Sequence, residues 1–229
     1  MKESCGENHI YRVNSFRELV STPFEGEKNA MCWSRKLNGD FKEIIYKIEL
    51  DGDITTISPK ELRGLQLSEQ GNIARDILLN DLALFTAHGS DPILNVIKQY
   101  ERDDAFPFFP TDVYSFHVDR SPVPVDTFLC TYHGTSSEII PNAHAEQKIL
   151  IPEIRTELQK IYNGPEAGFE DFLTENFFDL HYEDHGEPIT LGQGHVWKLA
   201  IDHPNSSVLP SIHRAPKENK GEPRLLLIC

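Results

Sequence analysis

The chain has 229 residues, of which 36 are Asp or Glu and 22 are Lys or Arg, so its formal net charge is −14. A chain of this length can bury a substantial hydrophobic core, and we expect residues 1–229 to form a single domain. The acidic excess argues against nucleic acid and against an anionic membrane surface as partners, because both carry the same sign of charge as the protein.

The first residues, MKESCGENHIYRV, contain no apolar run of the kind that a secretory signal needs. No stretch approaches the roughly 18 consecutive apolar residues that predict a membrane span. The cysteines are far apart and form no CxxC pair: they are Cys5, Cys32, Cys130 and Cys229. We therefore expect a cytoplasmic protein with reduced thiols.

Helical patterns dominate the chain from residue 39 to residue 102. Asp40 is suited to cap a helix over residues 41–48, where apolar residues recur three and four positions apart. Ser58-Pro59 is typical of a helix start, because serine caps the first turn and proline is tolerated within it. A longer helix is predicted from Ser68 to His88, and Gly89 suits its end.

Asp91-Pro92 predicts the start of one further helix, whose apolar side chains are Ile93, Val96, Ile97 and Tyr100. The chain after residue 104 instead predicts strands, which cover residues 113–118, 126–133, 195–201, 208–213 and 224–228. Two short helices are predicted among them, over residues 152–162 and 169–178.

Helices early in the chain and antiparallel strands later favour an α+β fold. We expect residues 1–104 to form a mainly helical N-terminal layer that buttresses a β core. That core is predicted over residues 105–229, with an insertion at about residues 135–192.

His117 and Asp119 are the first residues that point to chemistry, because they form an HxD pair at the end of a predicted strand. In an extended chain, residues two apart project to the same side. An imidazole nitrogen and a carboxylate oxygen can therefore reach one metal ion from these two positions.

His213 and Arg224 extend this pattern near the C-terminus, where they are separated by eleven positions (224 − 213 = 11). HxD followed by a distal histidine describes the two-histidine, one-carboxylate set that holds Fe(II) on one face and leaves the opposite positions open. A buried arginine at the later position can pair bidentately with the far carboxylate of a 2-oxo acid.

These motifs resemble those of the Fe(II)/2-oxoglutarate-dependent oxygenases, whose core is a double-stranded β-helix, a cupin-like jelly roll. The matching segments are FHVD (116–119), GHVW (194–197), SIHRAP (211–216) and PRLLLI (223–228). The chain also resembles, more closely, a bacterial family defined only as a domain of unknown function. That likeness adds CWSR (32–35) and LCTYHG (129–134), and it implies no activity.

The oxygenase resemblance implies that His117, Asp119 and His213 are catalytic iron ligands and that Arg224 anchors 2-oxoglutarate. The implied cofactors are Fe(II), 2-oxoglutarate as co-substrate and O₂. The implied reaction is hydroxylation of a small molecule or an amino acid, with release of succinate and CO₂. A halogenating relative would have a small residue in place of Asp119, so the carboxylate favours hydroxylation or desaturation.

One position departs from the family pattern, because some subfamilies have a serine two residues after the arginine, where this chain has Leu226. A second hydrogen bond to the co-substrate carboxylate must then come from another residue. The candidates that remain open are Thr131, Tyr132 and Tyr114.

Other residues are assigned more simply. Substrate-binding residues are expected to be Arg120, His133 and Trp197. An HxE pair, His144 and Glu146, is a rival ligand set within a predicted loop. Exposed loop positions are the simplest interpretation of the remaining histidines among polar residues: His181, His185 and His203.

Three other functions remain open at this stage. A cupin-like protein could bind a metal and a small ligand without oxygenase activity, and a zinc hydrolase could use the same three ligands to activate a water. A protein-interaction domain without a metal is the third. Arg224 discriminates against the first two, because neither chemistry needs a basic residue at that offset.

Overall fold

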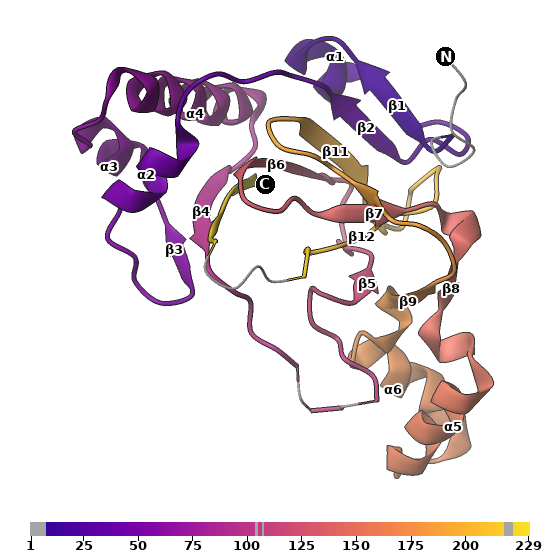
Figure 1. Cartoon of the computed structure of the whole chain (residues 1–229). Helices are drawn as coiled ribbons and strands as arrows, with labels where there is room; N and C mark the ends of the chain where they lie inside the picture. Colours follow the sequence, from indigo (N-terminus) through magenta and orange to yellow (C-terminus); the bar gives the residue numbers. More distant parts are fainter. Residues whose placement is uncertain (1–7, 104, 107, 218–221) are drawn as a thin grey trace.

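The computed structural model describes residues 8–103, 105, 106, 108–217 and 222–229. These residues form a mixed α+β protein with two curled, largely antiparallel sheets (Figure 1). In spatial order the first sheet contains β1 (Ile10–Val13), β2 (Ala30–Trp33), β11 (Val196–Ala200), β6 (Asp126–His133), β13 (Arg224–Ile228), β4 (Ile93–Ile97) and β3 (Ile54–Thr56). The second contains β10 (Ile189–Thr190), β7 (Glu138–Ile140), β12 (Ile212–Arg214), β5 (Phe116–His117), β9 (His181–Asp184) and β8 (Ala145–Gln147).

The helices lie in separate groups on opposite sides of the molecule (Figure 1). The N-terminal elements are α1 (Phe16–Ser21), α2 (Phe41–Lys47), α3 (Pro59–Gly64) and α4 (Glu69–His88), and the later ones are α5 (Pro152–Ile161) and α6 (Phe169–Glu175). Short 3-10 turns occur at Asn142–His144, Lys148–Leu150, Glu166–Gly168 and Phe178–Leu180. Within the described residues, no helix is both long enough and apolar enough to cross a membrane.

The predicted helix starts are confirmed by their caps. The Asp40 side chain accepts from the backbone of α2, and Ser58 forms a reciprocal capping box with Glu61 at the start of α3. Ser68 caps α4, which ends at Gly89 with φ +94°, a conformation that glycine adopts without strain.

The expectation of a helix after Asp91-Pro92 is wrong, because Ile93–Ile97 is β4, paired with β3 on one side and β13 on the other. Spacings of three and four also suit a strand that is buried on both faces, and Leu94, Val96 and Ile97 are all buried. The region before residue 104 is therefore a mixed layer that holds four strands as well as four helices among its described residues.

The later strands follow the prediction more closely. Strands β6 and β13 have the predicted bounds, and the strands predicted at residues 113–118 and 195–201 are shortened to β5 and β11. The strand predicted at residues 208–213 is β12, which begins later and ends one residue further on. The expected insertion at about 135–192 also needs correction. It contains α5 and α6 but also supplies β7 and β10 to the second sheet.

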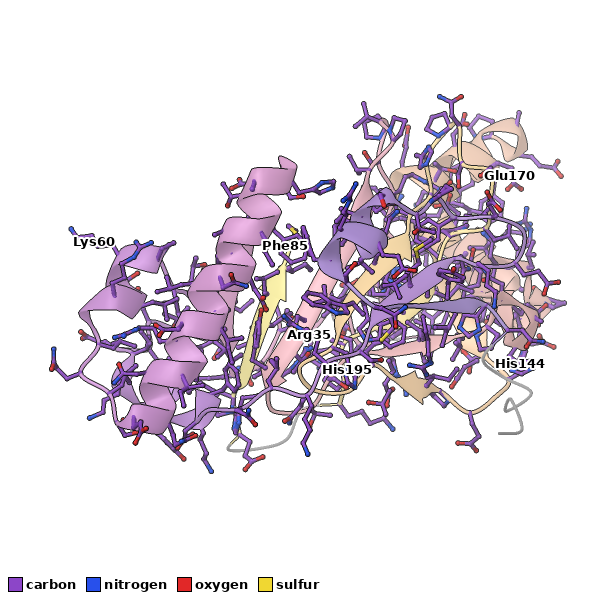
Figure 2. All side chains as sticks on the ribbon, turned by 90° about the horizontal axis from the view of Figure 1, so that it is seen from above. Arg35, Lys60, Phe85, His144, Glu170 and His195 are labelled. Carbon is purple, nitrogen blue, oxygen red and sulfur yellow. The ribbon has the colours of Figure 1, made fainter. Side chains whose placement is uncertain are left out.

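The two faces of the first sheet pack into two different apolar clusters. Leu225 and Leu227 of β13 face the helices and pack with Leu78 and Phe85 of α4, while Leu226 belongs to the cluster between the sheets. Figure 2 shows Phe85 between α4 and the strands. Because side chains alternate along a strand, Arg224 starts β13 on the same side as Leu226, toward the second sheet.

A buried polar network fastens α4 to the first sheet on its helical side. The Arg35 guanidinium forms an ion pair with Asp81 at 2.8 Å and donates to the Gly194 carbonyl at 2.9 Å. Arg35 contacts both oxygens of the Asp81 carboxylate, and the Tyr132 hydroxyl donates to one of them, Oδ2, at 2.6 Å. This network accounts for the CWSR segment structurally, because its arginine joins the helix layer to the turn before β11 (Figure 2).

Candidate metal centre

Three imidazoles lie side by side on the second sheet. His213 of β12 is the direct cross-strand partner of His117 of β5, which is in turn the partner of His181 of β9. Direct partners project from the same face of a sheet. His213 also pairs with Ile139 of β7, which packs in the cluster between the sheets, so the row of histidines faces the interior of the sandwich.

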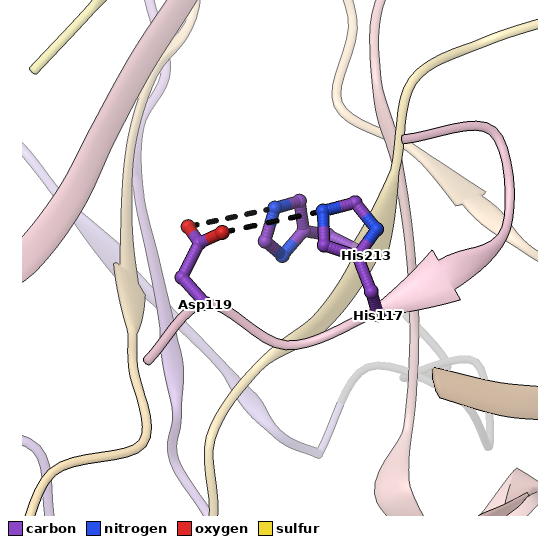
Figure 3. Close-up of side chains that lie close together, drawn as sticks. All are labelled: His117, Asp119 and His213. Atoms are coloured by element: carbon purple, nitrogen blue, oxygen red, sulfur yellow. Dashed lines mark ion pairs between the residues drawn. The ribbon is translucent and has the colours of Figure 1, made fainter. Parts of the chain in front are cut away.

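Asp119 lies just beyond β5 and turns its carboxylate toward two of these rings (Figure 3). Its Oδ1 lies 4.0 Å from His117 Nε2, and its Oδ2 lies 3.7 Å from His213 Nε2. One donor atom from each residue lies within 4.8 Å of the others. The structure therefore brings together the three residues that the HxD and distal-histidine pattern predicted as metal ligands.

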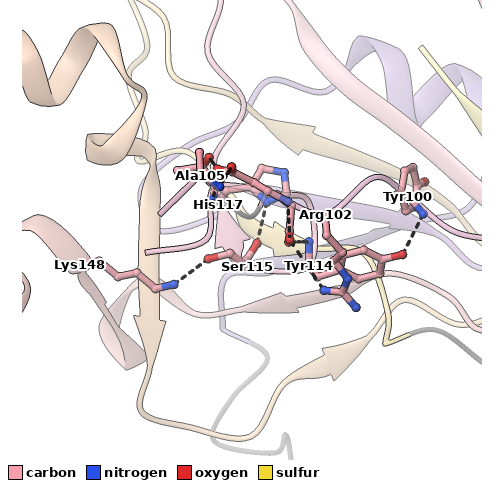
Figure 4. Close-up of polar contacts among 10 residues, drawn as sticks. Tyr100, Arg102, Ala105, Tyr114, Ser115, His117 and Lys148 are labelled. Carbon is pink, nitrogen blue, oxygen red and sulfur yellow. Dashed lines mark hydrogen bonds and ion pairs between the residues drawn. The ribbon is translucent and has the colours of Figure 1, made fainter. Parts of the chain in front are cut away.

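Backbone carbonyls orient both imidazoles in the same way. His117 Nδ1 lies 2.8 Å from the Ser115 carbonyl (Figure 4), and His213 Nδ1 lies 3.2 Å from the Ser211 carbonyl. A carbonyl only accepts, so each Nδ1 carries the hydrogen and each Nε2 lone pair is directed toward the carboxylate. This arrangement is typical of histidines that bind a metal.

The charge states of the cluster also suit a cation. Burial, helped by the nearby His213 ring, lowers the pKa of His117 to about 4, so the ring is neutral at physiological pH. Burial alone would raise the pKa of Asp119, but the His213 ring and the Thr127 hydroxyl bring it below its ordinary value. A neutral imidazole and an ionised carboxylate are the forms that bind metals.

Thr127 holds the carboxylate in place, because its hydroxyl donates to Asp119 Oδ2 at 2.6 Å. We expect Thr127→Val to weaken metal binding roughly 10- to 100-fold, since the carboxylate loses the partner that fixes its rotation. Thr127→Ser keeps the hydroxyl and is expected to stay near wild type. Co(II) titration followed by absorbance measures both affinities, and equal affinities for valine and wild type would contradict this role.

The buried histidines make the metal-free protein sensitive to acid. Burial lowers the pKa of His181 to about 3 and that of His117 to about 4, whereas an unfolded histidine titrates near 6.5. Between pH 6.5 and 4 the unfolded chain binds more protons, so stability falls with falling pH by about 1.4 kcal/mol per unit for each group. Urea unfolding in chelator at pH 7, 6 and 5 should show a shallower dependence for His181→Phe, and an unchanged one for the exposed His185→Phe.

Arg224 is a buried cation with unused donors. Arg224 is the first residue of β13, and only 7% of it is exposed. Its Nη2 donates to Ser137 Oγ at 3.0 Å and to Thr131 Oγ1 at 3.4 Å. Its Nε and Nη1 are buried and have no hydrogen-bond partner within the described part of the chain. Burial lowers the pKa of Arg224, and Tyr100 partly opposes this effect. Leaving such donors unpaired costs about 1–3 kcal/mol or more, so this site favours an anionic ligand.

The position of Ser137 relates Arg224 to the histidine row. Ser137 lies directly before β7 and two residues before Ile139, so both project to the same face of the second sheet. Because Ile139 pairs with His213, Arg224 reaches across from the first sheet to the β7 side of the row.

The three candidates for a second carboxylate partner are separated by the structure. Thr131 contacts Arg224, and Tyr114 lines a small cavity of about 20 Å³ together with Tyr100 and Arg224. The Tyr114 hydroxyl also accepts from the Tyr100 backbone at 2.9 Å. Tyr132 must be withdrawn, because its hydroxyl is bonded to Asp81 on the opposite, helical side of β6.

The structure places the three expected substrate residues in different surroundings. Arg120 is committed to surface ion pairs with Asp179 and Asp202, each at 2.7 Å. The Trp197 ring is buried between the sheets, and its Nε1 donates to a backbone carbonyl at 2.8 Å. His133 instead lines a cavity of about 470 Å³ with Lys42 and Tyr132, on the helical side of the sheet.

The rival HxE pair does not form a ligand set. Glu146 contacts the exposed His185 at 3.4 Å, and the donor group found among the described residues is the His117, Asp119 and His213 cluster. The expectation that His181 is an exposed loop residue is wrong, because it is buried in β9. One signal could have indicated a strand: His181 alternates with Tyr182 directly after the FFDL segment (177–180).

Comparisons of the chain with protein-family models, with curated proteins and with solved structures found no match in any of the three. The case for a function rests on the geometry of the centre and on Arg224.

Proposed function

We propose that this chain is a non-haem Fe(II)- and 2-oxoglutarate-dependent oxygenase that hydroxylates a small molecule or an amino acid. The observation that carries the proposal is Arg224, a buried guanidinium that reaches from the facing sheet toward the histidine row and has two nitrogens without a hydrogen-bond partner among the described residues. A bidentate carboxylate is the ligand that best satisfies such a group.

The donor set fits Fe(II). His117, Asp119 and His213 would hold the ion through two imidazole nitrogens and one carboxylate oxygen, as their Nδ1 bonds and the Thr127 contact support. Three protein ligands on one side leave positions for a bidentate 2-oxo acid and O₂. The same donors also suit zinc, so the ligands alone do not distinguish the two metals.

The strand pairing supports a jelly-roll core of the kind that cupins share. Eight of the described strands pair first with last and inward from there: β4 with β13, β5 with β12, β6 with β11, and β7 with β10. This is a long hairpin whose paired arms lie alternately in the two sheets. Winding such a hairpin brings β12 beside β7 and β13 beside β6, as the strand orders require.

Each residue then has a defined task. Bound Fe(II) and 2-oxoglutarate supply the activation of O₂ that hydroxylates a C–H bond, with release of succinate and CO₂. Arg224 would bind the far carboxylate of the co-substrate, and Thr131 and Ser137 hold its guanidinium. The apolar cluster around Ile139 and Leu226 excludes water from the space between the sheets.

Turnover of 2-oxoglutarate distinguishes this proposal from its rivals. Aerobic protein with Fe(II) and 2-oxoglutarate is expected to release succinate slowly even without substrate, and Asp119→Ala is expected to release none. Zinc-loaded protein that hydrolyses esters, combined with no succinate from the iron-loaded form, would favour a zinc hydrolase. Metal binding with neither activity would favour a cupin-like binding protein.

A further inference from the structure

His181 is a third imidazole at the centre that the proposed chemistry does not use. It is 4% exposed, its ring centroid lies 5.9 Å from that of His117, and it continues the row on the side away from His213. Its nitrogens fall outside the group of donors that lie within 4.8 Å of one another. His181 is therefore a neighbour of the ligands in this arrangement rather than one of them.

The Nδ1 atom of His181 is buried and has no hydrogen-bond partner in the described part of the chain. A buried polar atom without a partner costs about 1–3 kcal/mol, so it normally has a partner or a ligand. On one side the ring contacts Phe109, with centroids 6.1 Å apart. His181 therefore combines an apolar neighbour with a buried nitrogen that has no hydrogen-bond partner among the described residues.

Lys148 is a buried cation close to the same place. It is 9% exposed, its ammonium lies 5.5 Å from the centre of the Phe109 ring, and it donates to Ser115 Oγ at 2.8 Å (Figure 4). The Ser115 carbonyl in turn orients His117. Lys148 and His181 both lie against the Phe109 ring, so the two side chains share one neighbourhood.

Among the described residues, no carboxylate contacts this ammonium. Among the described residues its hydrogen bond is to a neutral serine, while Glu183, Asp112 and Asp184 act on it only at longer range. A buried ammonium with no carboxylate in contact is unfavourable, which points to an anionic ligand that supplies the missing charge. A cavity of about 260 Å³ is lined by Lys148 and Ser115 together with the acidic side chains of Asp112, Glu183 and Asp184, so a small molecule can reach the lysine.

The two ends of the row are chemically distinct. Arg224 reaches the β7 end through Ser137, and His181 stands at the β9 end, on the opposite side of the paired ligands His213 and His117. A co-substrate anchored by Arg224 would occupy the first end. The second end remains for another molecule.

We propose that His181 and Lys148 form the substrate-binding end of the centre, and that the substrate is a small molecule carrying a carboxylate. Lys148 pairs with that carboxylate, His181 hydrogen-bonds to the substrate beside the metal, and Phe109 packs against its apolar part. This inference rests on the proposed function, because it assumes that the centre holds a metal and that Arg224 takes the co-substrate.

Binding of matched carboxylates and amides tests the proposal. The probes are the twenty free L-amino acids, their carboxamides, and aliphatic mono- and dicarboxylic acids of two to six carbons, added to anaerobic protein holding Fe(II) and 2-oxoglutarate. We expect at least one carboxylate to bind at least tenfold more tightly than its amide by calorimetry. Lys148→Met should abolish that preference, whereas Lys160→Met, which changes an exposed lysine, should keep it. Carboxylates that bind no better than amides, or no binding by any probe, would overturn the proposal.

The melting temperature of the ligand-free variants distinguishes a binding role from a purely structural role. His181→Phe and Lys148→Met each remove a buried polar group that lacks a full set of partners, so the ligand-free variants should melt at or above the wild-type temperature. A drop of several degrees in both would show that these residues serve the fold. If Lys148→Met fails to fold, His181→Phe carries the test, and its carboxylate affinity is expected to fall at least tenfold.

The two proposals can fail separately. The iron–2-oxoglutarate absorption band reports the proposed function alone, and its absence from wild type counts against that function. A wild-type protein that shows the band but no preference for carboxylates over amides counts against the roles of His181 and Lys148 alone.

Discussion

Replacing His213 by alanine is expected to weaken Fe(II) binding by more than about 100-fold. The substitution removes one of three donor atoms, and loss of an outer hydrogen-bond partner alone typically costs 10–100-fold in metal affinity. It also leaves Asp119 Oδ2 without the ring that lies 3.7 Å away. Metal analysis after dialysis, together with Co(II) titration, measures the loss.

His185→Ala is the matched control, because that histidine is exposed and pairs with Glu146 rather than with a residue of the centre. Its metal affinity is expected to stay within about twofold of wild type, as for other exposed substitutions. Equal metal affinity for wild type and His213→Ala would remove the basis for the centre.

Arg224→Met is expected to raise the dissociation constant for 2-oxoglutarate by about 100-fold or more while Fe(II) affinity changes by less than about twofold. Truncating one partner of a buried, hydrogen-bonded charge pair costs about 2–5 kcal/mol. The metal ligands lie on the other sheet, so they keep their geometry. Anaerobic calorimetry of metal and co-substrate in turn separates the two affinities.

Arg224→Lys provides the conservative control for that experiment. Lysine keeps the charge but loses the planar fork, so we expect an affinity for 2-oxoglutarate between those of wild type and Arg224→Met. A parallel loss of iron and 2-oxoglutarate in Arg224→Met would contradict the assigned role, because it would show that the arginine supports the fold of the centre.

Local chemistry made the clustering of His117, Asp119 and His213 predictable from the sequence. The two donors of HxD project to the same side because side chains alternate along an extended segment. The distal partner was indicated by a histidine that is followed by an arginine near the C-terminus. The cap residues Asp40, Ser58 and Ser68 were equally readable, because their hydrogen bonds lie within one helical turn.

Tertiary pairing decided what the sequence left open. The apolar spacing at Ile93–Ile97 fits a helix and a buried strand alike, and pairing with both β3 and β13 selects the strand. Thr131 and Tyr132 alternate along β6, but which of them faces Arg224 depends on which side the helices cover. A register shift in the β6–β13 pairing next to Leu225 further obscures that parity.

His181 was missed for a related reason. Its neighbours in the sequence are polar and resemble a loop, and only its pairing with His117 turns it into a buried residue of the centre. Lys148 carries no sequence signal at all, because its burial depends on Phe109 and Ser115, which lie more than thirty residues away.

Anaerobic titration of the protein with Fe(II) and then 2-oxoglutarate tests whether the centre binds both. We expect a weak visible absorption band that appears only when both are bound, that saturates at one equivalent of each, and that disappears in Asp119→Ala. Folded, metal-loaded protein that shows no such band at saturating 2-oxoglutarate would contradict the proposed function.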